Sequence, residues 1–198
     1  MAKRASSFTN MVVTLVVITT VASFLLATVY NFTKEPIARA REAQRMVAIA
    51  QVVPDFDRLE VKMVQSYDGG DSLQFNFAYN EDTLVGIAVE TYTTSGWSGL
   101  ITAMVGFYPD GRIVDVVHLH HRETPGLGDK IEKSKSDWSN QFRGLDPRTT
   151  DLRVSKDGGE IDAITAATIT ARAYSEAIQR AFNTLQENFL NSQEGLSP

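Results

Sequence analysis

The amino-acid sequence contains no charged residue between Arg4 and Lys34. Within this interval, Met11 to Val29 form an apolar run that only hydroxyl-bearing side chains interrupt. As an α-helix rising about 1.5 Å per residue, this run would be about 28 Å long, close to the thickness of the hydrocarbon core of a bilayer. The run therefore predicts an N-terminal transmembrane helix in contact with lipid.

A cleaved signal peptide is the alternative, because the chain has a basic start. The apolar run exceeds the usual signal-peptide core and no clear Ala-x-Ala site follows it, so a retained anchor is favoured. Charge leaves the orientation open, since basic residues flank the run on both sides: Lys3, Arg4, Lys34, Arg39, Arg41 and Arg45. The hydroxyl residues of the run either face partner helices or bond to their own helix backbone: Thr14, Thr19, Thr20, Ser23 and Thr28.

The patterns predict an α+β chain in four segments. Residues 1–33 form the N-terminal tail and membrane helix, residues 34–54 a stalk helix with Pro36 in its first turn, residues 55–191 one soluble domain, and residues 192–198 a flexible tail. The stalk is expected to dock its distal half on the domain. A helix lying on the lipid surface is the alternative.

The soluble domain is predicted to contain antiparallel hairpins followed by a long helix. Five strand-like segments are separated by turn residues, and Pro109-Asp110-Gly111 is the strongest hairpin signal. The segments are 59–67, 73–79, 84–93, 101–108 and 113–119. Residues 130–142 read as partly helical and 152–154 as a short strand. From about Ile169 to Asn191, apolar residues recur at three- and four-residue steps, which is typical of a helix with one apolar face.

Composition excludes several kinds of function. The chain has no cysteine, so thiolate-held iron–sulfur clusters, disulfides and cysteine nucleophiles are ruled out. A net charge of −5 without a basic, aromatic-rich stripe argues against nucleic acid as a partner. The carboxylates show no spacing typical of acid–base catalysis. We therefore expect no catalytic residues, and a protein that is not an enzyme by itself.

Residues 162–170, Asp-Ala-Ile-Thr-Ala-Ala-Thr-Ile-Thr, lie where a turn passes into the last helix. A phosphate near Thr165 and Thr168 would meet free backbone N–H groups and the positive end of the helix. Small neighbouring side chains would let a bulky group approach the backbone. The alternative is an ordinary helix start, with Thr165 or Thr168 as its N-cap.

This stretch resembles the flavinylation motif of the FMN-binding domain in the Rnf and Nqr electron-transport complexes, usually Asp-x-x-Ser/Thr-Gly-Ala-Thr-x-Ser/Thr. The resemblance implies that a dedicated flavin transferase joins Thr168 to the phosphate of FMN. One residue departs from the usual motif, because Ala166 replaces its glycine. A methyl group there is a modest change at negative φ but is strained in a left-handed conformation.

Two further blocks resemble the same family: residues 123–128, Glu-Thr-Pro-Gly-Leu-Gly, and residues 94–101, Thr-Ser-Gly-Trp-Ser-Gly-Leu-Ile. The glycines of the first block would let main chain lie close to a planar ring. Trp97 either borders the flavin ring or is buried in the sheet core. The cofactor-binding residues implied are Gly96, Trp97, Glu123, Thr124, Gly126, Leu127, Gly128, Thr165, Ala166, Ala167 and Thr168.

The short chain favours the G subunit of the Rnf complex within this family. The resemblance then implies an electron relay in a bacterial inner membrane, single-pass, with its domain on the periplasmic side. Its partners would be the membrane subunits of the complex, a second subunit with covalent flavin, and the flavin transferase. The alternatives are the C subunit of the sodium-translocating NADH:quinone reductase and a noncatalytic assembly subunit whose motif has decayed. A stand-alone flavin reductase is disfavoured because no substrate-binding residues stand out.

His118, His120 and His121 raise the question of a metal site. On a strand, His118 and His120 would share a face while His121 points away, and no third ligand in that register is evident. We therefore expect no metal, and polar strand residues instead, with His121 close to the flavin.

Overall fold

The computed structural model describes residues 7–191, so the predicted tail at 192–198 lies outside the described residues. The chain divides into two compact units between Ala43 and Gln44. Helix α1 (Phe8–Val52) begins in the first unit and ends in the second. Its N-terminal part is apolar, exposed and long enough to cross a membrane, and it is the one such helix among residues 7–191.

Helix α1 is continuous through Pro36, so the expectation that Pro36 occupies a first turn is wrong. An interior proline loses one backbone hydrogen bond at a cost of about 3 kcal/mol, which the helical turns on both sides outweigh here. Three threonines of the apolar part donate to the carbonyl four residues earlier, at 2.7, 2.9 and 2.8 Å: Thr14, Thr19 and Thr28. The backbone of the same helix thus accepts the hydrogen bonds of these three hydroxyl groups.

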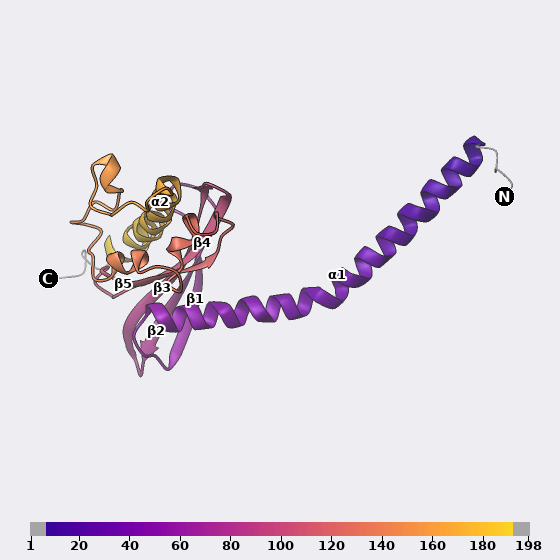
Figure 1. Ribbon diagram of the computed structural model, residues 1–198. Helices are drawn as coiled ribbons and strands as arrows, with labels where there is room; N and C mark the ends of the chain where they lie inside the picture. Colours follow the sequence, from indigo (N-terminus) through magenta and orange to yellow (C-terminus); the bar gives the residue numbers. More distant parts are fainter. Residues whose placement is uncertain (1–6, 192–198) are drawn as a thin grey trace. The chain divides into compact units, whose positions relative to one another are not determined.

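The second unit is built on a five-stranded antiparallel sheet in which every strand pairs with its neighbours in sequence (Figure 1). The strands are β1 (Arg58–Val64), β2 (Leu73–Asn80), β3 (Thr83–Gly96), β4 (Gly99–Phe107) and β5 (Ile113–His120). The predicted α+β class and the series of hairpins are confirmed. Strands β3 and β4 are longer than expected and meet where Gly96 pairs with Gly99, so Trp97 and Ser98 form the tip of a hairpin.

The two faces of the sheet have separate cores because side chains alternate along a strand. Ile87, Val89 and their neighbours face helix α2 (Thr168–Leu185) in the larger core. Ala88 and Met104 face the other side, where they pack with Ile49 and Val52 from the end of α1. On this side a Cβ on Gly106 would lie only 1.6 Å from the Val52 carbonyl oxygen, so glycine permits the close approach of helix and strand.

Short helical segments connect the sheet to α2. The expected partial helix at 130–142 is two 3₁₀ segments, η1 (Gly128–Ile131) and η2 (Trp138–Phe142). In place of the expected strand at 152–154, the structure has a single β-bridge between Val154 and Ile161. The 3₁₀ segment η3 (Ser155–Asp157) begins directly after Val154. Helix α2 ends in a π-helical turn, η4 (Gln186–Leu190), which confirms the predicted C-terminal helix.

Candidate cofactor site

Three segments far apart in the sequence form one cleft of about 390 Å³. They are the β3–β4 hairpin tip, the loop after β5, and the start of α2. The lining residues are Trp97, Glu123, Thr124, Leu127, Gly128, Ala166, Ala167, Thr168, Ile169 and Thr170. The structure therefore brings together residues from all three sequence blocks. Gly96, Gly126 and Thr165 belong to the same blocks but are not among the lining residues.

Thr168 is the first residue of α2 and half-buried. Ala167 holds the N-cap position and no side chain caps the helix, so the alternative that Thr165 or Thr168 acts as a cap is wrong. The Thr168 hydroxyl accepts a hydrogen bond from the Lys156 ammonium at 3.1 Å. Sequence reasoning missed Lys156, which comes from the separate segment η3.

A tight turn precedes Thr168. The Ala167 N–H donates to the Ile164 carbonyl at 3.0 Å, and Ala166 has φ of 63° while Thr165 does not have positive φ. This combination is that of a type II turn, whose third residue requires positive φ and so favours glycine. The structure thus places Ala166 in the left-handed conformation, where its methyl group is strained.

The loop at 123–128 contains a turn of the same type. The Leu127 N–H donates to the Thr124 carbonyl at 3.1 Å, with Pro125 second in the turn and Gly126, at φ of 78°, third. Gly128 then packs closely on the preceding acid, because a Cβ there would lie 2.8 Å from the Glu123 Cβ and Oε2 atoms. Two type II turns therefore flank the cleft, one with glycine at its third position and one with alanine.

The Glu123 carboxylate ties the three segments together. Only 5% of the residue is exposed. Its Oε1 accepts the Ser98 N–H at 3.0 Å, and its Oε2 accepts the Thr170 hydroxyl at 2.5 Å. A Cβ on Gly96 would lie 2.9 Å from the same Oε1. Hydrogen bonds to a carboxylate are among the stronger ones in proteins, so Glu123 braces the walls of the cleft. Sequence reasoning missed the parts played by Ser98 and Thr170.

The mouth of the cleft is apolar. Trp97 is 68% exposed, and Leu127 and Ile169 are each 40% exposed. The alternative that Trp97 is buried in the sheet core is therefore wrong, because the hairpin carries the indole past the end of the sheet. An apolar rim over small residues, with an ammonium group beside Thr168, fits a planar ring bearing a phosphate. The volume is also in the range typical of small-molecule sites.

The sequence matches the model of the FMN-binding domain over residues 96–183. It is 38% identical to the G subunit of the ion-translocating oxidoreductase complex of Shewanella loihica, over 84% of this chain and 85% of that protein. The G subunits of the same complex in Erwinia tasmaniensis and Vibrio atlanticus are 37% and 34% identical, over 85% and 83% of both chains. The chain belongs to this G-subunit family.

The region that matches the FMN-binding domain begins at Gly96 and ends within α2, so it includes all three walls of the cleft. The cofactor supported by this domain is FMN. The long apolar helix and the membership of the family together support association with a membrane.

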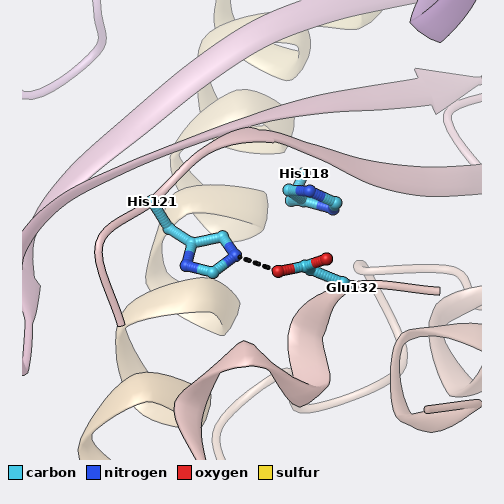
Figure 2. Close-up of side chains that lie close together, drawn as sticks. All are labelled: His118, His121 and Glu132. Atoms are coloured by element: carbon cyan, nitrogen blue, oxygen red, sulfur yellow. Dashed lines mark hydrogen bonds and ion pairs between the residues drawn. The ribbon is translucent and has the colours of Figure 1, made fainter. Parts of the chain in front are cut away.

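Beside the cleft, the chain carries a cluster of His118, His121 and Glu132, shown in Figure 2. The ring centroids of the two histidines are 5.3 Å apart, and one ligand atom from each of the three residues lies within 4.8 Å of the others. The expectation that His121 points away from His118 is therefore wrong. Strand β5 ends at His120, so strand alternation no longer governs where His121 points. Glu132 is the third group that the register argument did not find.

Hydrogen bonds already occupy this cluster. His121 Nδ1 accepts the Glu123 N–H at 3.1 Å, so Nε2 carries the ring proton and donates it to Glu132 Oε1 at 3.0 Å. The Lys135 ammonium also donates to Glu132 Oε1, at 2.7 Å, and lowers the pKa of that carboxyl group. Burial lowers the pKa of His118. The cluster thus holds the Glu123 backbone in place through the hydrogen bond to His121. His121 itself is not among the residues that line the cleft.

Proposed function

We propose that this protein is the electron-relay subunit of a membrane-bound, ion-translocating ferredoxin:NAD oxidoreductase, and that it carries FMN joined to Thr168 by a phosphoester. The name shared by the three relatives supports the complex, and the matched domain supports the cofactor. The proposal includes a periplasmic soluble domain, a flavin transferase that makes the bond, and electron exchange with membrane subunits and a second covalent-flavin subunit.

The observation that carries the covalent link is the position of Thr168. Its hydroxyl lies on the wall of the cleft at the start of α2, where backbone N–H groups are free and the helix dipole favours an anion. The Lys156 ammonium is in contact with the same hydroxyl. A phosphate attached there would be held by fixed positive charge, while the apolar rim at Trp97 and Leu127 would cover the ring.

The chain's own residues have a positioning role in this function. Bound FMN supplies the one- and two-electron chemistry. Glu123 fixes the distance between the hairpin and α2, and the exposed rim leaves one side of the cleft open to a partner. A covalent link prevents loss of the cofactor by dissociation in a compartment where free FMN is dilute.

The alternative of a noncatalytic subunit with a decayed motif rests on Ala166. The turn keeps the positive φ that glycine normally provides, in spite of the methyl group. The backbone around Thr168 thus has the conformation that a glycine motif would give it, which favours a working site. The names of the relatives, all G subunits, favour this complex over the sodium-translocating quinone reductase.

The test is intact mass and in-gel flavin fluorescence of the full chain co-expressed with the flavin transferase. We expect a mass increment of one FMN less one water in the wild type and in Thr165→Ala, and no increment in Thr168→Ala. Thr168→Ala should still fold and insert in the membrane, because its side chain does not cap α2. An unlabelled wild type beside a labelled Ala166→Gly variant would favour the decayed motif instead.

A further inference from the structure

Three hydroxyl groups lie close together around the start of α2, and they differ sharply in surroundings. Thr170 is 1% exposed and its hydroxyl already donates to Glu123, so a bulky phosphoryl donor cannot reach it. Thr165 is exposed on the type II turn, and no side-chain hydrogen bond is found for it among the described residues. Of the three, Thr168 alone combines partial exposure with a cation at its oxygen.

We infer that Lys156 is the residue that selects Thr168 for flavin attachment and then balances the charge of the phosphodiester. This inference rests on the proposed function and adds a residue to it. The Lys156 side chain is exposed, and the hydrogen bond to Thr168 Oγ1 directs its ammonium group toward the cleft. Lys156 lies outside the motif at 162–170, twelve residues before Thr168 in the chain.

The fold holds Lys156 in place through its neighbours. The adjacent Asp157 makes a two-pronged ion pair with Arg172 of α2, at 2.6 and 2.7 Å. These hydrogen bonds from Arg172 lower the pKa of Asp157, so the pair stays charged at neutral pH. On the other side, the bridge from Val154 to Ile161 closes the loop. Segment η3 is thus attached to the same helix that presents Thr168.

The chemistry explains why a cation is useful there. Forming the ester needs an activated FMN phosphate, which a flavin dinucleotide provides as a phosphoanhydride. Thr168 Oγ1 attacks the phosphorus on the flavin side, and the new O–P bond forms as the P–O bond of the anhydride breaks. AMP leaves with the electron pair, and the hydroxyl proton goes to a base on the transferase. The attached phosphodiester keeps one negative charge, which the Lys156 ammonium would pair with at hydrogen-bond distance.

The experiment compares rates of attachment on the purified full chain in detergent, with FAD and a limiting amount of flavin transferase. Wild type, Lys156→Gln and Lys156→Arg are followed by in-gel flavin fluorescence, and the labelled residue is identified by peptide mass mapping. The matched control is Lys62→Gln, which removes an equal charge from the exposed face of β1. Urea midpoints of all variants show whether each is folded.

We expect Lys156→Gln to be labelled about tenfold more slowly than wild type, with part of the label on Thr165, because one hydrogen bond to a charged group is lost. Lys156→Arg should stay within about twofold of wild type, and Lys62→Gln should match it. Labelling of Lys156→Gln at the wild-type rate and only on Thr168 would overturn the inference while leaving the proposed function intact. Equal slowing in Lys62→Gln would overturn it too, as a general charge effect. An unlabelled wild type would overturn both.

Discussion

Replacing Ala166 with glycine should make the protein more stable. Ala166 has φ of 63°, and an L-residue in the left-handed region costs about 1–2 kcal/mol. Glycine removes this strain but loses about 0.5–1 kcal/mol of conformational entropy on folding. The Ala166 methyl group is exposed, so its removal sacrifices little packing. The expected net gain is about 0.5–1 kcal/mol in the free energy of unfolding.

The measurement is urea unfolding of the full chain in detergent, followed by the fluorescence of Trp97 and Trp138. The urea midpoint should rise with the m-value unchanged. In a thermal melt, the same gain should raise Tm by about 1–4 °C for a domain of this size. The rate of flavin attachment should be at least as high as in the wild type, because the turn is unchanged.

Two control variants separate the effect of φ from the effect of glycine itself. Ala163→Gly changes an alanine of the same segment that does not have positive φ, and it should lower the stability by about 0.5–1 kcal/mol. Glu81→Gly changes the other non-glycine residue of the described chain with positive φ, at 53°, and it should be stabilising. A destabilised Ala166→Gly beside a stabilised Glu81→Gly would refute the reasoning for the turn.

Two further outcomes follow from the packing and the ion pairs. Gly106→Ala should destabilise the protein by about 3 kcal/mol, because the new Cβ collides with the Val52 carbonyl. Gly86→Ala is the milder comparison, because its new Cβ would have nearest contacts of 3.0–3.1 Å. It should cost about 1 kcal/mol or less in the same urea assay. Burial disfavours the charged form of Asp115, but hydrogen bonds from Arg143 and Lys133 outweigh it and lower its pKa. Its stabilising effect is therefore complete above the unfolded pKa of about 3.9 and is lost as pH falls through the lower folded value. Urea midpoints between pH 6 and pH 3 should show a shallower decline in Asp115→Asn, and an equally steep decline would contradict this assignment.

Local patterns in the sequence were enough to predict most of the fold. Alternation and turn residues identified all five strands, and the helical spacing after Ile169 identified α2. These features depend on neighbours in the chain, whose geometry is regular. The longer β3 and β4 were not predicted, because pairing across the hairpin extends both strands through residues with weak strand preference around Gly96.

The contacts that define the cleft could not be found in this way. The bond from Thr170 to Glu123 joins residues 47 positions apart, and the contact of Lys156 with Thr168 depends on a loop held by Arg172. Motifs placed the three segments in one site, but only the folded chain shows which atoms meet. The binding roles of the residues implied by the motifs remain predictions for the experiments above.

The connection of the hairpin, the loop and α2 through Glu123 has a consequence for biosynthesis. The sheet is a simple meander, whose neighbouring strands can pair early, since sequence-local contacts form fast. Helix α2 follows the sheet in the chain and supplies both Thr168 and the Thr170 hydroxyl that completes the brace. A transferase that recognises the assembled cleft would then modify only chains whose C-terminal helix has docked, and the attached flavin would mark each molecule that has finished folding.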